Sequence, residues 1–131
     1  MGSFSDYWEN EVLDHLFGKG SYSPPTIHLA LSTADPGDDG TGLSEPSGDG
    51  YARAVTSPAD WSVAASGTLA NADAIEFPEA SAAWGTVTHF ALFDAASGGN
   101  LLAHGALAQA KAIGSGDTAR FAPGDLEIHL N

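Results

Sequence analysis

The sequence contains no cysteine. Disulfide bonds, thiolate metal sites and cysteine nucleophiles are therefore excluded, and stability must come from a packed core. Charged residues are also scarce at 16%, whereas hydrophobic residues make up 43% and include three Trp, three Tyr and six Phe. This aromatic content favours a folded protein over a disordered acidic chain, and 131 residues fit one domain spanning 1–131.

Positive charge is nearly absent. Four Lys and Arg stand against 17 Asp and Glu, which gives a formal net charge of −13. Binding to nucleic-acid phosphates or to an anionic membrane surface requires clustered cations, so we expect neither partner. No apolar run approaches the roughly 20 residues that span a bilayer, and the first residues lack the basic head and apolar core of an export signal.

One amphipathic segment predicts a short N-terminal α-helix over about residues 6–17. Apolar side chains recur at Trp8, Val12 and Leu16, the spacing of one helical face. Ser5 is the expected N-cap, and Gly18 is the expected stop signal. A helix of this length is marginal alone, so it must pack against a sheet or another subunit.

After Pro24 and Pro25 the hydrophobic period changes from 3.6 to 2, the period of β-strands. The clearest strand is 86–93, in which Val87, His89, Ala91 and Phe93 are expected on one face. Both of its faces are partly apolar, so it should be central. We expect it to form a hairpin with 101–107 through a turn at 94–100. Further strands are expected at 27–32, 51–56, 61–63, 68–70, 75–77 and 126–130, and a second hairpin at 109–113 and 118–122.

Seven to nine strands with regular turns predict a mainly β fold, an antiparallel β-sandwich of the jelly-roll or Greek-key type with one short N-terminal helix. Residues 34–50 form the longest loop, rich in Gly, Pro and carboxylates. A loop of this length usually makes a contact, and we expect it to become ordered on binding a partner. Five carboxylates invite a Ca²⁺ hypothesis: Asp35, Asp38, Asp39, Glu45 and Asp49. The EF-hand spacing is not met, and a solvated acidic loop without cofactor is the preferred interpretation.

Catalytic signatures are missing from the sequence. The five histidines have no metal-site spacing, and four of them are expected in strands. Serine-nucleophile and phosphate-loop motifs are absent as well. We therefore predict a protein that is not an enzyme.

Partner binding is the function that remains. Trp and Tyr are favoured at protein interfaces, an acidic loop suits a basic partner, and the rare cations are expected to pair with carboxylates within the chain or across a contact. The candidate partner-binding residues are Trp8, Leu13, Phe17, Asp35, Asp38, Asp39, Tyr51 and Arg53.

Several sequence segments, taken together, resemble those of a family of small tailed-bacteriophage proteins, which are usually labelled tail-fibre or virion structural proteins. The resemblance covers nearly the whole chain, including the segment from Phe4 to Gly18. The matching phrases are Tyr22-Ser-Pro-Pro25, Leu29-Ala-Leu-Ser-Thr-Ala-Asp-Pro-Gly-Asp-Asp-Gly40, Gly50-Tyr-Ala-Arg53, Ile75-Glu-Phe-Pro78, Trp84-Gly-Thr-Val-Thr-His89, Phe93-Asp-Ala-Ala-Ser-Gly-Gly-Asn-Leu-Leu102 and Gly116-Asp-Thr-Ala-Arg-Phe121.

The resemblance implies a virion component assembled in the bacterial cytoplasm. The sequence has no repeats or heptads, which disfavours a fibre shaft, so the first interpretation is a head decoration or cement protein that binds the major capsid protein in many copies. A homo-oligomer or symmetric array is expected. The alternatives are a tail-fibre or tail-tip module bound to tail proteins, and a carbohydrate-binding sandwich that stacks a sugar on Trp61 or Trp84.

Overall fold

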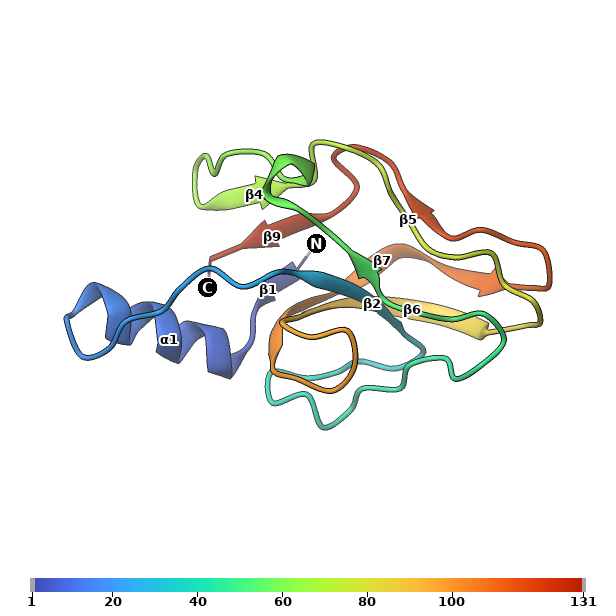
Figure 1. Ribbon diagram of the computed structural model, residues 1–131, viewed down its shortest axis with the longest axis horizontal. Helices are drawn as coiled ribbons and strands as arrows, with labels where there is room; N and C mark the ends of the chain where they lie inside the picture. Colours follow the sequence, from blue (N-terminus) through green and yellow to red (C-terminus); the bar gives the residue numbers. More distant parts are fainter. Residues whose placement is uncertain (1, 131) are drawn as a thin grey trace.

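The computed structural model describes residues 2–130. It is mainly β, with 35% of the residues in strands and 11% in helices. The expected fold class, mainly β with one short N-terminal helix, is confirmed (Figure 1). The elements in chain order are β1 (Gly2–Phe4), α1 (Asp6–Leu16), β2 (His28–Ser32), β3 (Ala54–Val55), the 3₁₀ turn η1 (Pro58–Asp60), β4 (Thr68–Ala70), β5 (Ile75–Glu76), β6 (Gly85–Phe93), β7 (Leu101–Ile113), β8 (Arg120–Phe121) and β9 (Glu127–His129).

Seven strands form one curled sheet in the order β3-β2-β6-β7-β1-β9-β4, and β5 and β8 form a second sheet of two strands. The β6–β7 hairpin is present as expected, and β6 lies inside the sheet between β2 and β7. Neighbouring strands are antiparallel except β1 and β9, which pair in parallel. Within residues 2–130, no helix combines the length and apolar character needed to cross a membrane.

The main core lies between one face of the large sheet and the small sheet. Leu29, Phe90 and Leu92 from the central strands are almost fully buried there. Phe121 of β8 packs edge-on against Phe90, with 6.5 Å between ring centroids, so the two-stranded sheet forms a second layer over the first.

The opposite face of the large sheet carries a smaller buried cluster of Ala30, Ala91, Phe93 and Leu101, against which Leu43 of the acidic loop packs. The loop is therefore a cover for this face. Leu43 gives the loop an apolar contact within its own chain, and its ordering on a partner stays a prediction.

A register shift in the β6–β7 pairing between Val87 and His89 corrects the expected faces of β6. Val87 packs in the main core with Phe90 and Leu92, and not with Ala91 and Phe93. A β-bulge adds one residue to one strand, so every side chain before it changes face relative to a strict alternation.

Three other expectations about strands need correction. The structure shows β1, which was not expected, because three residues are too few to show a period of two. Residues 109–113 do not pair with 118–122: they continue β7 and pair with the start of β6, while β8 pairs with β5. The strand expected at 61–63 is reduced to a single bridge between Trp61 and Asn71.

The helix α1 begins as the sequence predicts. Ser5 is its N-cap, and its side chain accepts a hydrogen bond from the backbone N–H of Trp8. Ser5 is also completely buried. Its hydroxyl donates a hydrogen bond to the carbonyl oxygen of Leu101, and its backbone N–H donates one to the carbonyl oxygen of Leu102 at 2.8 Å. One residue therefore both starts the helix and fastens it to β7. At the other end, Gly18 takes the positive φ of 71° that suits glycine.

We expect Ser5→Ala to lower the free energy of unfolding by about 0.5–2 kcal/mol, because the helix loses its cap and a buried carbonyl loses its donor. Urea denaturation measures the change. Ser3→Ala is the matched control, with an expected change within about 0.5 kcal/mol. Equal losses in the two variants would contradict the anchoring role of Ser5.

Candidate partner-binding surfaces

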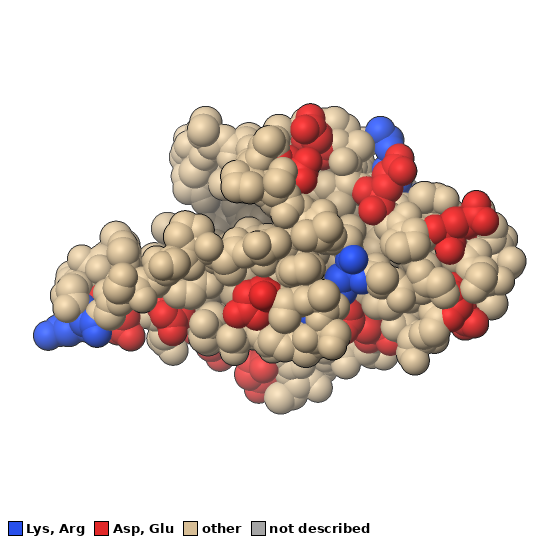
Figure 2. Space-filling view, in the orientation of Figure 1, with Lys and Arg blue, Asp and Glu red and all other residues tan. Residues whose placement is uncertain are grey.

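An apolar groove of about 740 Å³ opens on the surface of the described residues. Its walls come from α1, from the segment 22–27 and from residues 56–69, and its floor includes Leu92 of β6 and Ile128 of β9. Figure 2 shows the molecular surface hollowed between the helical arm and the lobe that contains β4. We call this feature the apolar groove.

Aromatic side chains give the apolar groove its character. Trp8 packs on Phe4 with 4.4 Å between ring centroids, and its indole N–H donates to the hydroxyl of Tyr22 at 3.1 Å. The indole N–H of Trp61 on the other wall donates to the hydroxyl of Thr56 at 3.0 Å. The polar atoms of both indoles are thus satisfied within the chain, which leaves their carbon surfaces for a ligand or partner.

The end of α1 is the second uncovered apolar feature. Leu13, Leu16 and Phe17 are 53%, 69% and 74% exposed. The first turn of the helix is fixed by Ser5, while the last turn and the following loop form the end of an arm that projects from the body (Figure 1). We call these three residues the helix end. Of the candidates from sequence, Trp8 therefore lies in the apolar groove, and Leu13 and Phe17 lie on the helix end.

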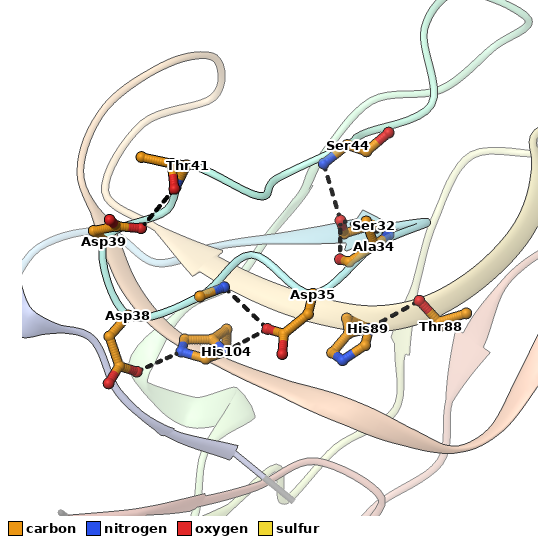
Figure 3. A network of polar contacts seen from close by, with 11 residues as sticks. Ser32, Ala34, Asp35, Asp38, Asp39, Thr41, Ser44, Thr88, His89 and His104 are labelled. Carbon is orange, nitrogen blue, oxygen red and sulfur yellow. Dashed lines mark hydrogen bonds and ion pairs between the residues drawn. The ribbon is translucent and has the colours of Figure 1, made fainter.

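The carboxylates of the acidic loop hold the loop in its conformation. Asp38 lies 2.8 Å from Nε2 of His104 on β7, and Asp35 lies 3.8 Å from Nδ1 of the same ring and accepts the backbone N–H of Gly37 (Figure 3). Asp39 accepts both the backbone N–H and the hydroxyl of Thr41, and these hydrogen bonds lower the pKa of Asp39. The carboxylates of Asp35 and Asp38 are nevertheless largely exposed, so they also form part of the surface.

Three strand histidines meet in space: His89, His104 and His129 line a shallow cavity of about 440 Å³ together with Asp35. Nδ1 of His89 is 2.8 Å from the hydroxyl of Thr88, and Nδ1 of His129 is 3.0 Å from that of Thr68. Among residues 2–130, no three His, Cys, Asp or Glu side chains are grouped so as to hold a metal ion. The sequence could not show this cavity, because its histidines come from three different strands whose register and pairing with β1 set their positions.

Tyr51 and Arg53 meet at Glu45, in the least exposed ion pair among the described residues. Nε and Nη2 of Arg53 donate to the two oxygens of the Glu45 carboxylate, at 2.9 and 2.8 Å. The guanidinium carbon lies 3.9 Å from the centroid of the Phe93 ring. The Tyr51 hydroxyl donates to Glu45 at 2.7 Å. The Arg53 side chain is only 3% exposed, so the carboxylate partner expected for this cation lies within the chain.

The same guanidinium donates to the carbonyls of Ala95 and Gly98, at 2.8 and 2.9 Å. Arg53 therefore joins the acidic loop to the β6–β7 turn. Burial raises the pKa of Glu45, but the hydrogen bonds from Arg53 and Tyr51 outweigh it and hold this pKa below its usual value. Burial and the contact with Glu45 raise the pKa of Tyr51.

The fold and these surfaces define a small acidic β protein with a projecting helix and an uncovered apolar groove. A comparison with protein-family models matches residues 3–129 to the family described as Podophage GP4 fiber I protein gp80. The match spans nearly the whole chain, and the chain belongs to this family. The resemblance to phage fibre proteins is confirmed: the chain is a phage structural protein, which implies a location in the virion. A search of curated proteins gave no significant match.

We expect Glu45→Gln to lower the free energy of unfolding at pH 7 by about 1–3 kcal/mol, because it removes the charge that compensates the buried guanidinium. The folded-state pKa of Glu45 is depressed, so its contribution is fully present above the unfolded-state pKa of about 4.3 and is lost as the pH falls through the folded-state pKa. The stability difference between the unmodified chain and E45Q should therefore shrink as the pH is lowered from 7 to 3, as measured by urea denaturation at each pH.

Glu79→Gln is the matched control, since Glu79 is exposed and forms no ion pair among residues 2–130. Its stability should follow that of the unmodified chain over the whole pH range. A deficit of E45Q that stays constant between pH 7 and pH 3 would show that the charge of Glu45 is not what stabilises the fold.

Proposed function

We propose that this chain is a non-enzymatic structural subunit of a phage tail fibre, which acts by binding other tail proteins. The observation that carries this proposal is the family match over residues 3–129. A match of that extent concerns the whole folded unit and not a short motif. The description of the family as a fibre protein supports the tail, which was the second interpretation from sequence.

The negative net charge of the chain favours a partner with a basic surface. Two of the four cations are used within the chain, Arg53 with Glu45 and Arg120 with Glu76 at 3.3 Å. On the face in Figure 2, acidic groups are spread over the arm and the body, and basic groups are few. A partner with a basic surface is attracted to such an exterior, whereas free subunits repel one another before assembly in the host cytoplasm.

The head-decoration interpretation places the same fold on the major capsid protein. The acidic exterior suits that partner equally, but the family description favours the tail, so we rank decoration second. The absence of sequence repeats agrees with a globular part of a fibre and not with its shaft.

Carbohydrate binding ranks below both virion interpretations. Trp84 is only 6% exposed, and its indole N–H donates to the carbonyl of Asp49 at 2.9 Å, so its ring is not available to stack on a sugar. Trp61 lines the apolar groove, where the part of the chain that the structure describes contributes no charged side chain. Sugar hydroxyls need well-placed polar partners beside the aromatic ring, and the groove offers few.

We expect antibodies against this chain to label the tail fibres in electron micrographs of intact particles. Labelling of isolated tails and not of tailless heads is the matched comparison. A regular array of label over the head would overturn the tail proposal in favour of decoration.

We also expect the purified chain to bind particles assembled without it, and to bind them more weakly as salt rises from about 0.05 to 0.5 M, because salt screens the attraction between an acidic exterior and a basic partner. Co-sedimentation with the particles measures the bound fraction. Binding that is unchanged by salt would contradict an electrostatic attachment.

A further inference from the structure

Among residues 2–130, the side chains that line the apolar groove include no Asp, Glu, Lys, Arg or His. This is unusual for a chain with 21 charged residues, 17 acidic and 4 basic. A charged partner surface that entered the groove would lose water and gain no counter-charge. The occupant that fits is an apolar protrusion.

This chain carries such a protrusion. The helix end (Leu13, Leu16 and Phe17) is convex, apolar and largely exposed. Along α1, Trp8, Val12 and Leu16 follow one another at intervals of four residues, so one apolar ridge starts inside the apolar groove and continues to the helix end. Concave and convex parts therefore adjoin in one continuous patch, as a self-complementary contact requires.

We propose that the partner in the apolar groove is a second copy of this chain, whose helix end enters the groove. The chemistry matches on both sides, because the inserted side chains and the groove lining are uncharged. One pair of neighbouring charges is complementary: Lys19 follows the helix end, and Asp60, which also accepts hydrogen bonds from Ser57, lies in η1 between two groove residues, Pro58 and Trp61. Figure 2 shows a basic group at the end of the arm, with an acidic group beside it.

The dependence on salt concentration distinguishes this contact from the attachment to basic tail proteins. Each copy carries a net charge of −13, so two copies repel at long range. Salt screens this repulsion and leaves the apolar contact intact. Pairing of copies therefore strengthens with salt, whereas attachment to a basic partner weakens. The pairing does not depend on where the chain sits on the particle, and its failure would leave the proposed function untouched.

Analytical ultracentrifugation of the purified chain over a range of concentrations tests the pairing. We expect the unmodified chain to associate, and the L16S/F17S double variant of the helix end to dissociate at least about tenfold more readily. Leu130→Asp, at an exposed residue that lines the groove, should have the same effect from the other side of the contact. Both changes are at exposed positions, and circular dichroism checks that the variants are folded.

Mixing the two variants is the decisive experiment. The L16S/F17S chain retains an intact groove, and the L130D chain retains an intact helix end, so the mixture should regain association that neither variant shows alone. Val63→Ser is the matched control, because Val63 is 90% exposed but lies outside both features, and it should behave as the unmodified chain does.

Three outcomes would overturn the proposal. They are an unmodified chain that stays monomeric at millimolar concentration, a mixture that fails to associate, and association that weakens as salt is added. The first would mean that the groove receives a different protein, and the third that charge and not apolar contact joins the copies.

Discussion

The structure depends on one constraint: the central strands β2 and β6 must be covered on both faces. Leu29 and Leu92 are buried on one face, and Ala30 and Ala91 are buried on the other. The small sheet covers the first face. Residues 2–130 form no third sheet over the second face. The acidic loop, which has little regular structure, covers that face instead, and polar contacts hold the loop in place of strand pairing.

Two contacts between distant segments hold the loop. Glu45 binds Arg53, which also reaches the β6–β7 turn, and Asp38 lies against His104 on β7. The charges of a segment that looks solvated in the sequence are thus partly used to close the fold. This explains why a strongly acidic chain buries one of its few arginines, since only a cation with several donors can satisfy a carboxylate and two carbonyls together.

Local signals in the sequence were sufficient to predict the elements that depend on residues close together in the chain. The cap at Ser5, the end of the helix at Gly18 and the β6–β7 hairpin follow from capping, glycine conformation and alternation. Long-range pairing was not predictable: β1 is too short to show a period, and the bulge before His89 shifts faces without a sequence mark. For the same reason the helix end could be named from sequence, whereas the apolar groove could not, because its walls come from segments far apart in the chain.

The position of the helix links the fold to assembly. The buried hydroxyl of Ser5 fixes the first turn of α1 on β7, so the helix leaves the body at a set angle, with Trp8 in the groove and Phe17 in solvent. A helix packed along its whole length would have filled the groove and hidden its own apolar end. Because it is held only at its beginning, the chain keeps a concave and a convex apolar surface at once, while the negative charge of its exterior opposes the approach of a second copy at long range and is screened by salt.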